Sequence, residues 1–337
     1  MKKRLCSLAV ASLTLGLFSG EHPAQAAEGG HGVYLLGLRG PGAGILPPEG
    51  VYFSDSFYYY SGSAQASRGF PTEGGQIAAG LNAKVRLDLV SAAWTTPVQI
   101  LGGNLAFSAL LPIGGPSVNA NATLASPLFP AGIAVAAHDS VFTYGDPAFS
   151  ATLGWHSGNF HWTTGVTTFV PVGDYRQGAL ANVANHRLAA DVNGAITWLD
   201  PNIGLDLSAA LGVTFNQENA ATNYKTGNEF HFEWAAVQNL SKQFSIGVVG
   251  YYYKQITGDS GLGATLGAFK GEVTAVGGTI GYNFKIGNLP VATRLKIYRE
   301  FDVTNRLEGT AGFVTLSMPL YVATARSPAE RVISSKY

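Results

Sequence analysis

Apolar and polar residues alternate with a period of two along much of the chain. Residues Asn82–Leu89 read Asn-Ala-Lys-Val-Arg-Leu-Asp-Leu, and Ile203–Phe215 carries the same alternation over a longer stretch. A period of two is typical of a β-strand whose two faces meet different surroundings. The pattern predicts an all-β chain of about 12 strands. The expected strands are Val51–Ser61, Asn82–Leu89, Asn104–Leu111, Ala148–His156, Phe160–Val170, Leu188–Trp198, Ile203–Phe215, Glu229–Leu240, Phe244–Tyr253, Val273–Phe284, Val291–Arg299 and Ala311–Leu320.

The connections between the expected strands alternate between short and long. Short turns fall at residues 157–159, 199–202, 241–243 and 285–290, and long loops fall at residues 171–187, 216–228 and 254–272. An outer-membrane barrel has this arrangement, with short periplasmic turns and long extracellular loops. The sequence therefore predicts a transmembrane antiparallel β-barrel over residues 51–320. Residues 90–103 depart from the scheme, because a short turn is expected there and a longer connection separates the two strands.

The low charge of the chain supports a surface that faces lipid. Only 12% of the 337 residues are charged, while 43 residues are Gly and 11% are aromatic. Soluble domains carry about 25% charged residues. The apolar and aromatic content excludes intrinsic disorder, and the formal net charge of +0 gives no electrostatic case for a nucleic-acid partner. A soluble secreted β-sandwich explains the alternation equally well, but it explains the low charge and the alternating loop lengths poorly.

The first 26 residues have the features of a signal peptide. Lys2, Lys3 and Arg4 precede an apolar stretch at residues 5–18, and Ala24-Gln25-Ala26 is a small-residue cleavage site. Removal of residues 1–26 takes away Cys6, the single cysteine, and changes the formal net charge to −2. We therefore expect an exported chain without disulfides or thiolate metal sites. After it come a Gly/Pro-rich segment (27–50), the barrel (51–320) and a polar C-terminal tail (321–337).

The Gly/Pro-rich segment 27–50 is unsuited to a strand or a helix. It has two interpretations, a plug inside the barrel or a periplasmic tether, and the sequence leaves both open. Four of the five Trp lie near the expected periplasmic turns, where aromatic residues of a barrel meet the lipid headgroups. We predict that Trp94, Trp155, Trp162 and Trp198 form this membrane-interface girdle.

The alternation also assigns side chains to the lumen. If Ala83, Val85, Leu87 and Leu89 face lipid, then Lys84, Arg86 and Asp88 face inward, because charge on the lipid face is costly. The same logic directs further charged residues inward, namely Asp191, Asp206, His231, Glu233, Arg294 and Lys296. Inward-pointing tyrosines would offer aromatic surface to a passing ring. The candidates are Tyr58, Tyr60, Tyr251, Tyr253 and Tyr298.

Four stretches of the chain resemble one family of outer-membrane proteins. They are Gly37–Tyr52 with its ending Pro-Pro-Glu-Gly-Val-Tyr, Gly145-Asp146-Pro147 followed by Leu153-Gly154-Trp155, Pro171–Tyr175, and Asn216–Asn219 with Thr222–Gly227. As a set they are similar to the meta-pathway phenol degradation proteins, also called SphA-like. The resemblance implies an outer-membrane channel of a Gram-negative bacterium that admits hydrophobic or aromatic compounds, and the family name does not establish an enzymatic step. The polar tail beyond Leu320 departs from barrels that finish on their last strand.

We therefore expect facilitated diffusion of a small hydrophobic or aromatic solute through a barrel in the outer-membrane bilayer. We expect no cofactor, no metal and no nucleic-acid partner, and the sequence leaves the oligomeric state open. Two other classes remain as alternatives: an outer-membrane lipid hydrolase, and a structural or adhesive barrel that acts through its long loops. His138-Asp139-Ser140 is the nearest approach to a hydrolase motif, and a His-x-Ser match is expected by chance in such a chain. We therefore assign no catalytic residue.

Overall fold

The computed structural model describes residues 28–71, 77–126, 129–265 and 267–323. Within these ranges 12 antiparallel strands close into a barrel, because β2 pairs with both β1 and β3. Each expected strand is present, and the all-β barrel prediction is confirmed. The strands are β1 (Gly50–Pro71), β2 (Ile77–Ile100), β3 (Gly103–Ser126), β6 (Ala148–Ser157), β7 (Phe160–Phe169), β8 (Ala189–Asp200), β9 (Leu205–Asn216), β10 (Glu229–Asn239), β11 (Phe244–Gln255), β12 (Glu272–Ile286), β13 (Leu289–Thr304) and β14 (Glu308–Val322).

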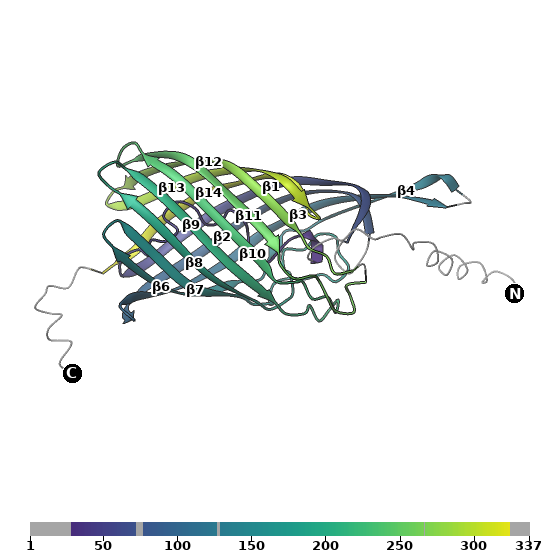
Figure 1. Cartoon of the computed structure of the whole chain (residues 1–337), viewed down its shortest axis with the longest axis horizontal. Coiled ribbons are helices and arrows are strands. Elements are labelled where there is room, and N and C mark those ends of the chain that lie inside the picture. The colour runs from purple at the N-terminus through teal and green to yellow at the C-terminus, as the bar shows by residue number, and fades with distance from the viewer. Residues whose placement is uncertain (1–27, 72–76, 127–128, 266, 324–337) are drawn as a thin grey trace, which may run out of the picture.

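The first strands are much longer than the alternation predicts. The expected long connection at residues 90–103 is wrong, since β2 continues to Ile100 and a two-residue turn at Leu101 and Gly102 leads into β3. Two further strands were not expected: β4 (Phe129–Ser140), which pairs with the far end of β3, and the short β5 (Thr143–Tyr144). Figure 1 shows β4 extending well beyond the barrel wall.

The outer face of the barrel is apolar. On β9, Leu207 and Leu211 are exposed, whereas Asp206 and Ser208 are buried on the inner face. The neighbouring strands continue the apolar exterior with Val192, Ile196, Val248, Val276, Ile280, Leu295, Ile297 and Val314. A closed barrel satisfies every strand edge, and an exposed apolar belt of this extent matches lipid rather than water. The protein is thus a transmembrane β-barrel.

The two ends of the barrel differ. The short turns gather at the end where β14 finishes, and the long loops gather at the opposite end, where the described chain begins with the short 3-10 helix η1 (Glu28–Gly30) (Figure 1). By the rule for bacterial barrels the short-turn end is periplasmic and the long-loop end is extracellular. Among the described residues, no helix has the length and apolarity needed to cross a membrane. The expected signal peptide and most of the expected C-terminal tail lie outside the described residues, and β14 extends two residues past Leu320.

Candidate functional site

Residues 28–49 run through the inside of the barrel from the long-loop end to the short-turn end. At the long-loop end the backbone N–H of Glu28 donates to Thr226 Oγ1, with 3.3 Å between the two atoms. Further along, Gly44 N–H donates to Thr197 Oγ1 at 2.9 Å, and both partners are buried. The segment then joins β1 at Gly50, whose neighbours in the sheet are at the periplasmic ends of β2 and β14. We call residues 28–49 the lumen segment.

Lys296 on β13 holds the middle of the lumen segment. Its Nζ donates to the carbonyl oxygens of Gly37, Leu38 and Arg39, at 2.5, 2.8 and 3.0 Å. The Tyr298 hydroxyl donates to the same Gly37 oxygen at 3.3 Å. Gly37 has a φ of 83°, and a Cβ at this position would lie 2.9 Å from the Tyr298 ring. This turn therefore requires glycine for both its conformation and its close approach to the wall.

A second contact fixes the lumen segment to β8 and β10. The Tyr34 ring stacks on the His231 imidazole with 3.7 Å between centroids, and the Tyr34 hydroxyl donates to Glu233 Oε1 at 2.7 Å. His231 Nε2 lies 2.8 Å from Asp191 Oδ2. Arg39 Nη2 donates to Asn193 Oδ1 at 2.7 Å. These contacts are all on the β8–β13 half of the wall, so the segment lies against that half.

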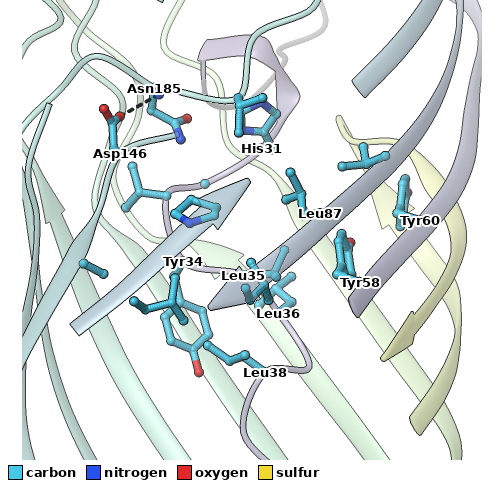
Figure 2. Close-up of a pocket in the computed structure, with 18 of the residues that line it drawn as sticks. His31, Tyr34, Leu35, Leu36, Leu38, Tyr58, Tyr60, Leu87, Asp146 and Asn185 are labelled. Atoms are coloured by element: carbon cyan, nitrogen blue, oxygen red, sulfur yellow. Dashed lines mark hydrogen bonds between the residues drawn. The ribbon is translucent and has the colours of Figure 1, made fainter. Parts of the chain in front are cut away.

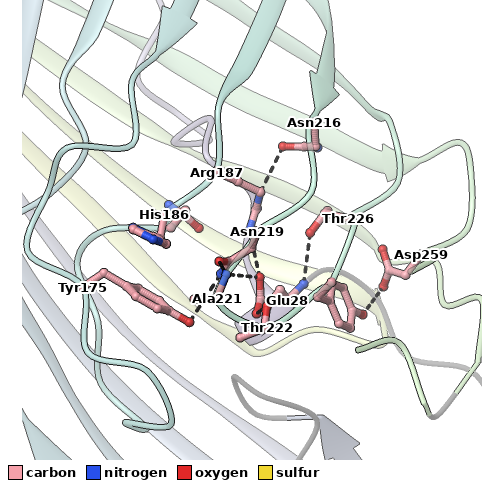
Figure 3. Close-up of polar contacts among 12 residues, drawn as sticks. Glu28, Tyr175, His186, Arg187, Asn216, Asn219, Ala221, Thr222, Thr226 and Asp259 are labelled. Carbon is pink, nitrogen blue, oxygen red and sulfur yellow. Dashed lines mark hydrogen bonds and ion pairs between the residues drawn. The ribbon is translucent and has the colours of Figure 1, made fainter. Parts of the chain in front are cut away.

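Polar loop residues gather around Glu28 at the extracellular end of the lumen (Figure 3). Glu28 accepts hydrogen bonds from Thr222 and Asn219 and lies 3.9 Å from the Arg187 guanidinium. Burial nevertheless raises the pKa of the Glu28 carboxyl above its ordinary value. Burial also raises the pKa of Asp259, which accepts the Tyr224 hydroxyl in the same layer. These contacts join the start of the lumen segment to three long loops, which follow β7, β9 and β11.

The loop between β7 and β8 is also attached through Asp146. Its Oδ1 accepts the N–H of Gly173 at 2.9 Å, and its Oδ2 accepts the N–H groups of Asn185 and His186 at 2.7 and 3.0 Å. One carboxylate therefore fastens both ends of the loop between β7 and β8. Parts of this loop form the upper wall of the cavity described below.

Replacing Asp146 with Ala should release this loop. Hydrogen bonds to a charged group contribute about 1.5 to 3 kcal/mol each, so amide exchange at residues 173–186 should accelerate by at least about tenfold, or about 1.4 kcal/mol. Hydrogen-exchange mass spectrometry measures this, with Asp174→Ala as the matched control, because Asp174 accepts only the exposed Thr143 hydroxyl among the bonds found here. Unchanged exchange in Asp146→Ala would contradict the assigned role.

A cavity of 540 Å³ lies between the lumen segment and the opposite half of the wall. Its lining is mainly aliphatic, with Val85, Leu87 and Leu89 from β2 facing Leu35 and Leu36 of the segment. Figure 2 shows Leu35, Leu36 and Leu87 together with Tyr58 around this space. Toward the periplasm the lining changes to small side chains, which are Ser54, Ser56, Ser91, Ala93, Ser108, Ser150 and Thr315.

A second cavity, of 740 Å³, opens at the short-turn rim between Tyr52, Val291 and Ser317. It shares no lining residue with the first cavity. Ser54 lines the first cavity and Ser317 the second, and their hydroxyl oxygens lie 2.9 Å apart in a hydrogen bond. The two cavities therefore come close to each other at this pair of serines, on the β1–β14 side of the barrel.

The structure overturns the inward placement of Lys84, Arg86 and Asp88. Ala83, Val85, Leu87 and Leu89 line the cavity instead, and Arg86 is on the outer face, with its Cζ 6.0 Å from the Tyr59 ring centroid. The register explains the error. Lys84 pairs with Ser61, which pairs with Thr310 near the extracellular start of β14, so this part of the outer face lies close to water, where charge carries no lipid penalty.

The other predicted lumen residues are on the inner face. Asp191, Asp206, His231, Glu233 and Lys296 are buried there, and Arg294 bonds Thr279 from the same face. Tyr60 and Tyr251 both donate to Glu300, Tyr253 donates to Glu229, and Tyr58 packs on Phe313. The inner charges thus contact the lumen segment and each other rather than an open channel. They do not gather at the cavity, which Tyr58, Tyr60 and Tyr251 line.

The four predicted girdle residues are on the outer face near the short turns. Trp94 and Trp162 are among the exposed side chains. Trp155 stacks on Trp162 and donates its Nε1–H to the Leu101 carbonyl in a periplasmic turn. Trp198 is partly exposed next to the turn after β8. Whether they anchor the barrel stays a prediction.

Several residues of the site were missed. Tyr34 and Arg39 lie in the Gly/Pro-rich segment, which has no periodicity to orient them, and Arg306 lies in a loop. Glu300 could have been predicted from the alternation. It follows Lys296 and Tyr298 at the same spacing of two, so it lies on the inner face, one residue past the expected strand end.

The hydrolase motif gains no support from the geometry. His138 bonds Asn119, while Asp139 pairs with Arg176 and accepts the Ala181 N–H. Among the described residues, no group of His, Cys, Asp and Glu could hold a metal ion.

Comparison with known proteins agrees with this architecture. A family model described as "Putative MetA-pathway of phenol degradation" matches residues 66–316. The crystal structure of the COG4313 outer membrane channel from Pseudomonas putida F1 is similar, with a TM-score of 0.63, 13% identity, and coverage of 82% of this chain and 97% of that one. A FadL homologue from Pseudomonas aeruginosa has 12% identity and a TM-score of 0.38, over 80% of this chain and 88% of its own. No curated protein matches the chain.

Proposed function

Because the chain belongs to the family described as "Putative MetA-pathway of phenol degradation", we propose that this outer-membrane barrel is a channel for facilitated diffusion of small hydrophobic or aromatic compounds. The observation that carries the proposal is the 540 Å³ aliphatic cavity inside the barrel. Barrel interiors are ordinarily polar, so an apolar cavity in the lumen needs an apolar guest to explain it. Engineered protein cavities of about 150 Å³ already bind benzene, which leaves ample room here for a compound of one ring.

The proposed path follows the half of the wall that the lumen segment leaves uncovered. A guest would pass the loops at the extracellular end, lose its hydration in the aliphatic part, and move toward Ser54 and Ser317. The small side chains below the aliphatic part offer hydroxyls that hydrogen-bond one another, as Ser56 and Thr315 do at 2.8 Å. In this proposal a guest passes between the cavities by displacing these serine side chains.

Narrowing this path should reduce flux without disturbing the fold. Ser54→Met places a long side chain between the two cavities. In vesicles with a lipopolysaccharide outer leaflet, which apolar solutes cross slowly, we expect uptake of labelled toluene to fall about tenfold, or about 1.4 kcal/mol of added barrier. Phe57→Leu is the matched control, since Phe57 is on the same strand but faces outward. Heat-dependent mobility on an unboiled gel verifies that both variants fold.

Three results would contradict the proposal. Wild-type vesicles that take up toluene no faster than protein-free vesicles would exclude a channel for this class of solute. Unchanged flux in Ser54→Met would exclude the path. Release of fatty acid from the vesicle lipids would instead indicate the hydrolase alternative.

A further inference from the structure

One cation in the cavity wall has no hydrogen-bond partner. Arg306 lies in the loop between β13 and β14 and lines the 540 Å³ cavity. Its Cζ lies 4.1 Å from the centroid of the Tyr253 ring, and its Nη1 is buried with no hydrogen-bond partner. Among the contacts of the described residues there is no hydrogen bond or ion pair to this guanidinium. The preceding Asn305, at a φ of 55°, is fixed by a bond from its Nδ2 to the Lys270 carbonyl.

The acids near Arg306 already have other donors. Glu300 accepts the hydroxyls of Tyr60 and Tyr251 and the N–H of Gly309. Glu229 accepts the hydroxyl of Tyr253 and the amide of Asn216. These carboxylates balance the guanidinium charge through space, but they do not use its N–H groups.

The other charged side chains of the cavity lining each have a hydrogen-bond partner. Asp146 accepts three backbone N–H groups, and Arg39 donates to Asn193. His31 also lines the cavity, close enough for Arg306 to act on it electrostatically. Arg306 is therefore the charged side chain of the described lining for which no hydrogen bond or ion pair is found.

A guanidinium presents a planar fork of N–H donors that matches a carboxylate, and such pairs are stronger in a water-poor site. We propose that the cavity selects small amphipathic monocarboxylates, with the carboxylate paired to Arg306 and an aromatic ring or short acyl body against Val85, Leu87 and Leu36. This inference rests on the proposed function, because it names a solute class for the same cavity. A guest of this kind supplies both the apolar body that the wall fits and the acceptor that Arg306 lacks.

The test compares benzoate with benzamide, which has the same shape and no charge. Isothermal titration calorimetry on the folded barrel in detergent at neutral pH should show benzoate binding at least about tenfold tighter than benzamide. In Arg306→Met the affinity for benzoate should fall to that for benzamide, whose own affinity should stay unchanged. Arg306→Lys should retain part of the preference, since it keeps the charge and loses the fork.

Arg299→Met is the matched control, because it removes the same charge from the outer face, where Arg299 pairs with Glu308 and its side chain is 61% exposed. Equal wild-type affinities for benzoate and benzamide would overturn the inference, and this comparison needs no variant to fold. An unchanged benzoate preference in a folded Arg306→Met protein would overturn it as well. Calorimetry measures equilibrium binding and not transport. Toluene flux in a protein without a benzoate preference would therefore reject the carboxylate selectivity and leave the channel proposal standing. A benzoate preference in a protein without any flux would reject the channel proposal and leave the carboxylate site standing.

Discussion

Deletion of residues 28–47 should raise the single-channel conductance of the barrel by about an order of magnitude. Barrels of about 8 strands are filled by their own side chains, and those of 16 or more leave an aqueous channel. A barrel of 12 strands lies between these limits, so the lumen segment decides how much of its interior is open. Its removal exposes inner-face groups that hydrate readily, among them Glu233, Lys296 and Asn193.

The barrel itself should survive this deletion. The ladder between β1 and β14 begins at Gly50 and needs no residue of the lumen segment. Planar-bilayer recording measures the conductance, and an unboiled gel shows whether the shortened protein has folded. Unchanged conductance in a folded barrel would reject the plug interpretation and leave the segment a structural lining.

Lys296→Met should release the middle of the lumen segment while leaving it attached to β1. The substitution removes the donor of three carbonyl bonds and a cation 4.8 Å from the Phe313 ring centroid. Hydrogen bonds from a charged donor contribute about 1.5 to 3 kcal/mol each, so loss of all three should shift the equilibrium between docked and undocked segment more than about a hundredfold.

A cysteine placed at Leu35 reports this release, because Leu35 packs on the buried core when the segment is docked. We expect maleimide to label it much faster in the Lys296→Met background, and the conductance to become larger and noisier. Arg294→Met is the control, since Arg294 is also on the inner face of β13 but bonds Thr279 of the wall. Equal labelling in the two backgrounds would show that Lys296 does not hold the segment.

The strands could be predicted from the sequence because successive side chains of a strand point alternately to lipid and to the filled lumen. The two environments select different residue types, and this gives a period of two. The period alone does not say which face is inside. For Asp191, Glu233 and Lys296 the lipid penalty decides, and these residues are inside. Lys84 and Arg86 lie on the part of β2 near the extracellular end of β14, where an outward charge meets water and not lipid. The rule that charged side chains face the lumen therefore fails for these two residues.

The contacts of the site could not be predicted, because they join residues far apart in the chain. Tyr34 meets Glu233 across 199 positions, and Lys296 meets Gly37 across 259. A Gly/Pro-rich segment without periodicity gives no signal for such partners. The unpartnered state of Arg306 is likewise a property of its surroundings, since it depends on Glu300 and Glu229 being occupied by tyrosines.

The course of the lumen segment constrains how the protein can be assembled. Glu28 is at the long-loop end and Gly50 is at the short-turn end, so the chain is threaded through a ring that its own β1 and β14 complete. Either the seam between these two strands closes around a segment that is already inside, or the segment slides in from the periplasm with its N-terminal end leading. Both routes carry that end across the membrane, so a tag joined directly ahead of Glu28 would emerge on the cell surface.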